Sequence, residues 1–241
     1  MADLVHYRLA DGIATITLDD GKRNALSPEM FRQIYAALDR AEADRAVVIL
    51  TGREQVFSAG FDLKVMRGAP LEALRMLRAG YALTARVLAY PYPVIAACNG
   101  HALAMGVFLM LSADYVIGTR GEFRISANEV AIGMMMPRVA AAMLRYRLNP
   151  ADFQTAVALA KYFAVEDALR AGFFDELADA ATLLVRAHEL AAEFAKLDMP
   201  AHTASKRRIR GPLNRTIRRS VPLDLLDAAW VGVKTALRGR R

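Results

Sequence analysis

The chain has 241 residues, of which 55% are hydrophobic and 24% charged. This is the composition of a globular protein that can bury a sizeable core, and it excludes an intrinsically disordered chain. No apolar run reaches the ~18 residues that a membrane-spanning helix needs, no secretion signal is evident, and Cys98 is the only cysteine. We therefore expect a cytoplasmic protein without disulfides and without a membrane partner.

The net charge of +7 is unevenly distributed along the chain. From residue 201 onward there are 11 Lys and Arg residues against two Asp residues, a surplus of nine, so the first 200 residues carry a net charge of −2. Such a basic segment is typical of a solvated helix face, or of a surface that binds the phosphates of a small molecule or of nucleic acid.

The first half of the chain alternates strand and helix signals. In chain order the pattern predicts strands at 4–9 and 13–18, a helix at 28–44, a strand at 46–50, a helix at 71–89 and a strand at 94–98. Asp11-Gly12 is typical of a hairpin turn, and Ser27 followed by Pro28 is typical of a helix start. Because strands that alternate with helices usually pair in parallel, we expect an α/β fold.

The second half is predicted to be almost entirely helical after one more short strand at 115–118. The expected helices lie at 137–147, from 150 onward, and at 166–171, 178–197, 201–210 and 223–237. Met199-Pro200 interrupts this series and is the best candidate for a boundary. We therefore predict two parts, a core over 1–199 and a helical, basic C-terminal segment over 200–241.

The stretch from Asn99 to Asp114 is the one around which we interpret the rest of the sequence. It follows the 94–98 strand, begins with small residues and a glycine, and continues as a helix-compatible run without charge. A strand, a tight turn and a helix start leave free backbone N–H groups that hold developing negative charge. With Met105 or Gly106 supplying one N–H, we expect part of an oxyanion hole here.

Two further motifs carry potential chemistry. Residues 57–63 include three small residues in a row, which let a ligand approach the backbone so that the N–H of Phe61 points into the site. A tight loop in which Asp62 caps a helix explains the same motif equally well. Glu129 is surrounded in the sequence by apolar residues, where burial would raise its pKa and suit it to act as a base near neutral pH. The alternative is a surface or salt-bridged glutamate.

In this order and spacing the three motifs resemble the crotonase (enoyl-CoA hydratase/isomerase) superfamily. The resemblance covers about residues 5–175 and is carried by Arg23-Asn24-Ala25-Leu26, Phe57 to Leu63, Asn99-Gly100 through Met105-Gly106 to Asp114, and Asn128 to Gly133. It implies a spiral of ββα units, with C-terminal helices used in trimer packing. We therefore expect a homotrimer or a dimer of trimers.

The resemblance also implies a substrate and a site. The substrate would be an acyl-CoA thioester, with no further cofactor and no metal, and its carbonyl oxygen would be held by the N–H groups of Phe61 and Met105. Glu129 would be the catalytic acid or base. The residues implied to line the substrate path are Lys22, Ala25, Leu26, Ala59, Gly60, Asp62, Leu63, Gly106, Phe108 and Pro137.

Phe108 bears most directly on which reaction is catalysed. Hydratases of the family are similar, except that they carry two glutamates, one at the position of Phe108 and one at that of Glu129. An aromatic side chain neither activates water nor moves a proton, and losing one member of such a pair typically removes a factor of ~10²–10⁴. One glutamate is enough to move a proton from C2 to C4 of a 3-enoyl-CoA. We therefore predict a Δ3,Δ2-enoyl-CoA isomerase, with enoyl-CoA hydratase as the alternative.

The basic C-terminal segment leaves a hypothesis of another class, a catalytically weak homologue that binds RNA. Some relatives of the superfamily bind RNA, and Ser205-Lys206-Arg207-Arg208 could meet its phosphates. The sequence shows no recognised nucleic-acid motif and no aromatic residues interleaved with the basic ones. The same cations could equally meet the phosphates of CoA. We therefore expect an acyl-CoA, and not nucleic acid, as the partner.

Overall fold

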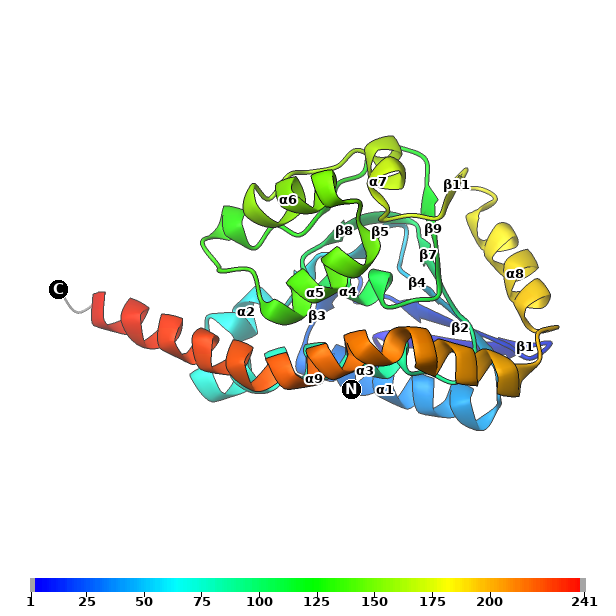
Figure 1. The fold of residues 1–241 in the computed structure, drawn as a ribbon, viewed down its shortest axis with the longest axis horizontal. Coiled ribbons are helices and arrows are strands. Elements are labelled where there is room, and N and C mark those ends of the chain that lie inside the picture. The colour runs from blue at the N-terminus through cyan, green and yellow to red at the C-terminus, as the bar shows by residue number, and fades with distance from the viewer. Residues whose placement is uncertain (1–2, 239–241) are drawn as a thin grey trace.

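A computed structural model of the chain describes the backbone of residues 3–238 and the side chains of residues 3–230. Its largest sheet has six strands in the order β1-β2-β4-β7-β9-β11 (Figure 1). These strands are β1 (Val5–Ala10), β2 (Ile13–Leu18), β4 (Val47–Thr51), β7 (Val94–Cys98), β9 (Tyr115–Thr119) and β11 (Glu176–Ala178). β1 and β2 form the predicted antiparallel hairpin, and the other neighbours pair in parallel, which confirms the predicted α/β class.

Short strands follow three of these long strands and form a second, smaller sheet. They are β5 (Gln55–Ser58), β8 (Gly100–Leu103) and β10 (Ile125–Ser126), in the order β10-β8-β5. A third sheet pairs β3 (Ala25–Leu26) with β6 (Gly60–Phe61). Because a long strand, a short strand and a helix repeat along the chain and the repeats stack, the fold is the spiral of ββα units that the resemblance implies.

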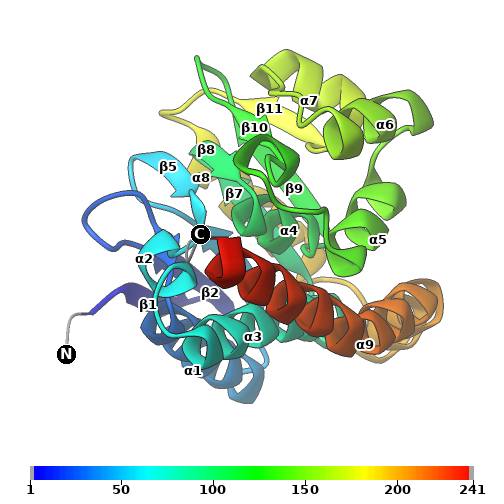
Figure 2. The same cartoon turned by 90° about the vertical axis from the view of Figure 1, so that its left-hand side faces the viewer.

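Helices surround these sheets (Figures 1 and 2). They are α1 (Pro28–Ala43), α2 (Leu63–Met66), α3 (Pro70–Leu88), α4 (Met105–Leu111), α5 (Arg138–Arg147), α6 (Pro150–Ala158), α7 (Val165–Ala171), α8 (Leu183–Phe194), α9 (Met199–Arg238) and the 3-10 turn η1 (Val130–Ile132). α1 begins as predicted, since the Ser27 hydroxyl accepts from the N–H of Met30 and Pro28 occupies the first helical position.

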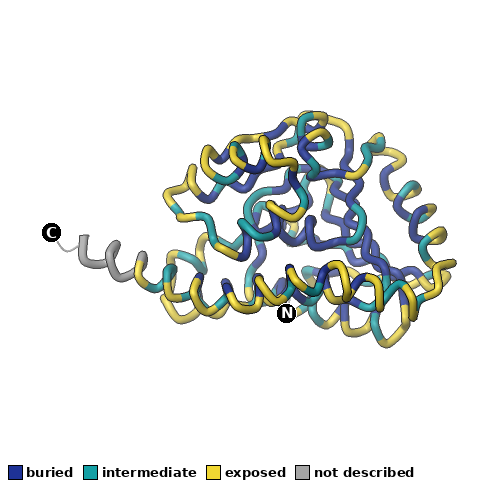
Figure 3. The backbone as a smooth tube through the Cα atoms, viewed as in Figure 1, coloured by how far each residue is buried: buried dark blue, intermediate teal, exposed yellow. Residues whose placement is uncertain are grey.

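The main sheet is buried on both faces. Along β4, Val48 and Leu50 point into the large core that α1, α3 and α4 cover, whereas Val47 and Ile49 point into a smaller core under α8. Side chains of a strand alternate between the two faces, so an unbroken apolar run is what such a strand requires. Figure 3 shows the strands and α4 as the most buried part of the molecule.

Three segments differ from the sequence prediction. Residues 100–103 are not a turn but the strand β8, because they pair with β5 and β10. Residues 176–178 form the strand β11 beside β9, so the helix predicted at 178–197 is reduced to α8. The helices predicted at 201–210 and 223–237 are one helix, α9, although it contains Pro212 and Pro222. Packing along α3 and α5 outweighs the cost of these prolines.

Buried ionic contacts fix α9 to the core at two places. Lys206 and Arg210 bind the carboxylate of Asp114 at 2.6 and 3.1 Å, and Arg210 also donates to two carbonyl oxygens at the end of α4. Further along, Asp224 accepts from two backbone N–H groups at the start of α5, both at 2.9 Å. α9 begins at the predicted boundary, and the division into 1–199 and 200–241 stays a prediction. No helix in the described part of the chain is long and apolar enough to cross a membrane.

Candidate active site

Two glycines bring the motif at 57–63 against the start of α4. A Cβ atom added at Gly60, whose φ is +88°, would lie 2.9 Å from the Cβ of Ala104 and 3.3 Å from the nitrogen of Met105. A Cβ atom added at Gly106 would lie 2.6 Å from the carbonyl oxygen of Ser58. No side chain fits at either position. The two segments that the sequence predicts to share an oxyanion hole are therefore in direct backbone contact.

Free N–H groups stand at the start of α4. The first bond inside the helix runs from the N–H of Val107 to the carbonyl of Ala104 at 2.9 Å, so the helix has no acceptor for the N–H groups of Met105 and Gly106. Ala104 itself has φ +48° and ψ −124°, a conformation rare for a residue with a side chain. Such a conformation costs of order 1–3 kcal/mol and persists only where the surroundings enforce it.

The N–H of Phe61 faces away from β3. Its neighbour Asp62 donates to the carbonyl of Leu26 on β3 at 3.3 Å. Successive N–H groups of an extended strand point to opposite edges, so the Phe61 N–H points to the other edge of β6. β6 lies beside the start of α4, because Gly60 contacts Ala104 and Met105. That the N–H groups of Phe61 and Met105 open onto one region stays a prediction.

Two buried polar side chains, Ser58 and Asn24, hold this arrangement through hydrogen bonds that their sequence motifs did not predict. The Ser58 hydroxyl donates to the carbonyl of Asn24 at 2.7 Å and accepts from the N–H of Gly60 at 3.1 Å. The Asn24 amide donates to the carbonyls of Leu18 and Phe57, at 2.8 and 3.1 Å. Asn24 has φ +51°, a region that asparagine tolerates better than most residues. The signal available in the sequence was an asparagine in a tight polar loop.

Glu129 is a buried acid. It is 4% exposed, and its Oε2 atom has no hydrogen-bond partner among the described residues. Loss of hydration on burial raises the pKa of Glu129 to about 7, against a smaller opposing effect of a hydrogen bond from its own backbone. Within the described part of the chain it is the one carboxylate with a buried, unpartnered oxygen. Near neutral pH this carboxylate can both accept and return a proton.

Glu129 follows a strand, β10, that lies directly beside the residues preceding α4. β10 pairs with β8 so that Ser126 lies opposite Leu103, and the carbonyl of Ser126 accepts from the N–H of Ala104 at 2.9 Å. Glu129 follows three residues later. The negative charge of Glu129 also contributes to raising the pKa of Tyr81. The ring of Tyr81 packs edge-on against Phe61, with the centroids 6.0 Å apart. The predicted site residues Phe61, Met105 and Glu129 thus come from three consecutive repeats of the fold.

Phe108 lies on α4 and is 1% exposed. It belongs to the large core, so its ring is packed against other apolar side chains. The structure therefore puts no second carboxylate at this position. Among the described residues there is also no group of three or more His, Cys, Asp or Glu side chains that could hold a metal ion.

The remaining predicted lining residues divide into two groups. Ala25 and Leu26 of β3 pair with Gly60 and Phe61, and the N–H of Ala59 donates to a carbonyl in the adjoining loop at 3.0 Å. These residues adjoin the contact between β6 and α4.

The others lie further out. Lys22 is exposed, Leu63 is 51% exposed at the start of α2, and Pro137 directly precedes α5. Asp62 accepts from the N–H of Lys64 at 2.8 Å, so it caps α2 as the structural alternative predicts.

The basic C-terminal segment is less available than the sequence suggests. Lys206 is 4% exposed, and its ammonium group is held by Asp114, so it cannot meet a phosphate without leaving the core. Arg207 and Arg208, its neighbours, are exposed. Of the three cations in the stretch Ser205-Lys206-Arg207-Arg208, only the two arginines are therefore accessible to a phosphate group.

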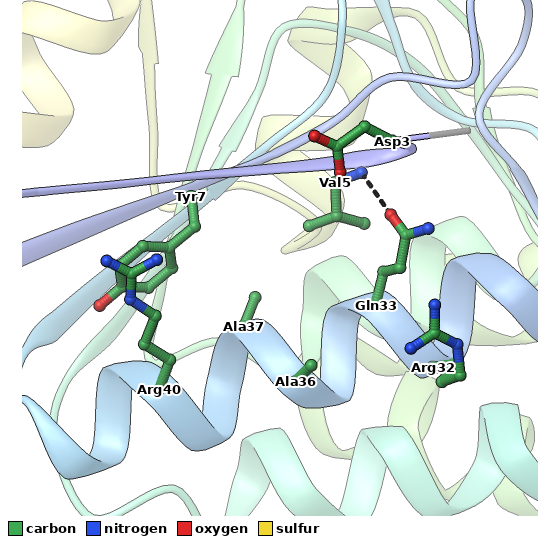
Figure 4. Close-up of a pocket in the computed structure, with 8 residues that line it drawn as sticks. All are labelled: Asp3, Val5, Tyr7, Arg32, Gln33, Ala36, Ala37 and Arg40. Atoms are coloured by element: carbon green, nitrogen blue, oxygen red, sulfur yellow. Dashed lines mark hydrogen bonds between the residues drawn. The ribbon is translucent and has the colours of Figure 1, made fainter. Parts of the chain in front are cut away.

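A separate cavity of about 440 Å³ lies between β1 and α1, away from these residues (Figure 4). Three of its polar groups have partners: the Tyr7 hydroxyl donates to Asp44 at 2.7 Å, Arg40 stacks over the Tyr7 ring, and Arg32 pairs with Glu29.

Comparison with known proteins decides the family. The model of the enoyl-CoA hydratase/isomerase family matches residues 8–224, which contain every predicted site residue. The chain belongs to the enoyl-CoA hydratase/isomerase family. The match confirms the resemblance drawn from the motifs, and it makes the protein a family enzyme that acts on an acyl-CoA.

Solved structures of this family are similar to the chain over nearly its full length. An enoyl-CoA hydratase/isomerase family protein from Pseudomonas syringae is 43% identical with a TM-score of 0.91, over 92% of this chain and 97% of that one. The enoyl-CoA hydratase EchA3 of Mycobacterium marinum is 43% identical with a TM-score of 0.88, over 92% and 98%. An enoyl-CoA isomerase of Mycobacterium tuberculosis is 44% identical with a TM-score of 0.89, over 93% and 98%. These names include both reactions, so the reaction has to be argued from the site.

Proposed function

We propose that the chain is a Δ3,Δ2-enoyl-CoA isomerase in which Glu129 moves a proton from C2 to C4 of the acyl group. The observation that carries the proposal is a single buried carboxylate, with its pKa raised to about 7, in a site whose other family glutamate position is Phe108. The names of the similar solved structures include both reactions, so the choice rests on these two residues.

The first half of the reaction forms a dienolate. The thioester oxygen of a 3-enoyl-CoA accepts hydrogen bonds from the N–H groups of Phe61 and Met105. The Glu129 carboxylate removes a proton from C2, and the electron pair of that C–H bond delocalises onto the oxygen and over C2 to C4. Donors fixed in advance at the place where negative charge develops typically lower a barrier by about 2.7–4 kcal/mol each.

The second half returns the same proton. The Glu129 carboxylic acid protonates C4, the double bond forms between C2 and C3, and the thioester carbonyl is restored. Glu129 is then ionised again, so atoms and charge balance without a second acid or a co-reactant. A pKa near neutrality suits both steps, because the group must be a base in the first and an acid in the second. We also propose, from the family's trimer packing, that the chain assembles as a homotrimer or a dimer of trimers.

The test is an assay panel on the purified protein with a 3-enoyl-CoA and a 2-enoyl-CoA of the same chain length. We expect conversion of the 3-enoyl to the 2-trans-enoyl thioester and slow or no hydration of the 2-enoyl thioester. Glu129→Gln keeps the size of the side chain but cannot accept a proton, and we expect it to lower kcat by about 10²–10⁴.

Two results contradict the proposal in different ways. If Glu129→Gln keeps most of the isomerase activity, the base is another group. If the wild type hydrates the 2-enoyl thioester rapidly, the argument from Phe108 fails and the protein is a hydratase. A gel shift with RNA that excess acyl-CoA does not compete away would instead favour an RNA-binding homologue.

A further inference from the structure

The backbone of α3 leaves a space for the ring of Phe61. A Cβ atom added at Gly80, in the interior of α3, would lie 2.6 and 2.8 Å from the Cε1 and Cζ atoms of Phe61, and 3.1 Å from Cζ of Phe31. Real Cβ atoms essentially never come so close to a neighbour. Glycine is unfavourable inside a helix compared with alanine. Its presence here is explained by the ring that rests on the helix backbone.

Two further aromatic rings pack against Phe61 at this place. Phe31 of α1 lies 6.0 Å from Phe61, centroid to centroid, at an interplanar angle of 59°. Tyr81 of α3 lies 6.0 Å away on an edge-to-face contact of 83°. Both separations are within the range in which aromatic pairs attract. Phe31 and Tyr81 are 1% and 2% exposed, so they have little room to move aside. We call Gly80, Phe31 and Tyr81 the Phe61 seat.

The main chain of the same residue carries a proposed oxyanion donor. On its other side, Gly60 contacts Ala104 and Met105, and β6 pairs with β3. The peptide between Gly60 and Phe61 is therefore held between α4 and β3, while the ring fixes the side-chain end of Phe61. A ring that is pushed off α3 has to turn this peptide or strain it. Misplacing a catalytic group by 1 Å can cost about 10²-fold in rate.

We propose that the Phe61 seat fixes the direction of the Phe61 N–H, so that Gly80 and Tyr81 are positioning residues for the thioester oxygen. The inference rests on the proposed function, because it concerns the same oxyanion site. The seat stays uncharged through the reaction: burial, followed by the charges of Asp224 and Glu129, raises the pKa of the Tyr81 phenol.

The first experiment adds one methyl group under the ring. We expect Gly80→Ala to lower kcat for a 3-enoyl-CoA by about 10- to 100-fold, with KM changed less than about threefold. The matched control is Gly211→Ala on α9, where the new Cβ meets only the Nη1 atom of Arg215 at 3.4 Å. It adds the same methyl group to a helix glycine and should leave kcat unchanged.

The second experiment observes the oxyanion site without turnover. A 3-ketoacyl-CoA bound to the protein should show the ultraviolet absorbance of its enolate, because the N–H donors favour the ionised form. Gly80→Ala should lose most of this band, and Gly211→Ala should keep it. This readout does not depend on isomerase activity. If the wild type lacks isomerase activity but shows the band, the proposed function fails while the seat remains testable.

Rescue separates positioning from damage to the fold. Phe61→Leu keeps the backbone donor and shortens the side chain, so it makes room for the added methyl group. We expect the double variant Gly80→Ala/Phe61→Leu to have at least about fivefold higher kcat than Gly80→Ala alone. If Gly80→Ala does not fold, Phe61→Leu alone takes its place, with an expected loss of kcat and of the enolate band in a folded protein.

Three outcomes overturn the inference. One is wild-type kcat and a wild-type enolate band in Gly80→Ala. Another is a double variant that is no better than the product of the two single effects. The third is a wild type without any enolate band, which would mean that the Phe61 N–H is not an oxyanion donor at all.

Discussion

The two halves of the proposed site are held in different ways. The donor half, around Gly60 and Gly106, is fixed by contacts between backbone segments that leave no room for a side chain. The base half is a short turn: Glu129 is buried, but the next residues are open to solvent, with Val130 42% and Ile132 50% exposed. Interiors packed without voids transmit even small changes, whereas exposed turns absorb them. The comparison suggests that the donors tolerate no change of position and that the base depends mainly on its own environment.

The largest expected effect tests the rigidity of the donor half. Gly106→Ala would place a methyl group 2.6 Å from the carbonyl oxygen of Ser58 and push the start of α4 away from the end of β5. Removing one oxyanion donor costs about 10²–10³ in kcat, and we expect a loss near the lower end. Ile132→Ala, in the exposed turn of the base half, should change kcat less than about threefold. If steady-state kinetics gives equal losses of kcat for Gly106→Ala and Ile132→Ala, the two halves do not differ in rigidity.

The second effect comes from the environment of the base. Glu129 must be ionised to take the proton from C2, and burial raises its pKa to about 7. We therefore expect kcat/KM for the 3-enoyl-CoA to rise about tenfold for each pH unit below 7 and to level off above it. A pH profile that is flat from pH 5 to 8 would show that Glu129 has the pKa of an ordinary surface glutamate.

The smallest effect is on stability, and its sign follows from the same pKa. The folded-state pKa of about 7 is above the usual 4.5. At pH 4 the carboxyl is protonated in both states and contributes nothing. Between 4.5 and 7 the unfolded chain ionises first, so the free energy of unfolding falls as pH rises. Above pH 7 the loss is complete and of order 3 kcal/mol.

Glu129→Gln removes this penalty. We expect the variant to be more stable than the wild type at pH 8 by about 1–3 kcal/mol and equal to it at pH 4. Denaturant unfolding at the two pH values measures both differences. A variant that is less stable at pH 8 would mean that the Glu129 carboxylate has a partner in the folded protein. A gain in stability together with a loss of activity would mark the acid as one kept for function.

Local signals in the sequence predict a large part of this fold. The strand at 46–50 and the helix that Ser27 caps follow from their own residues and from the periodicity of their apolar positions. β8 and β11 do not, because each is a strand only by virtue of partners elsewhere in the chain: β11 pairs with β9, some 60 residues earlier. Pro212 and Pro222 predict a break that packing against α3 and α5 prevents.

The site divides in the same way. The motifs predict Phe61, Met105 and Glu129 as site residues, and these roles stay predictions. The contact between Gly60 and Met105 joins segments far apart in the sequence, and only the fold shows it. The burial of Glu129 was predicted from its apolar neighbours, yet Val130 and Ile132 are exposed. The prediction of burial is right, but its reason holds only in part, because Ala127 is buried and Met136 packs against the core while Val130 and Ile132 do not.

The attachment of α9 through Asp114 has a consequence for the order of folding. Lys206 lies 92 residues after its carboxylate partner, and Arg210 lies 98 and 97 residues after its carbonyl acceptors. None of these contacts forms until the segment between α4 and β9 is in place, because Ser112, Ala113 and Asp114 supply the acceptors. Contacts between residues so distant in the chain form late and slow the overall rate. A ribosome-bound chain that ends before residue 206 contains all six strands of the main sheet but neither Lys206 nor Arg210. Asp114 therefore has no cationic partner from α9 at that stage.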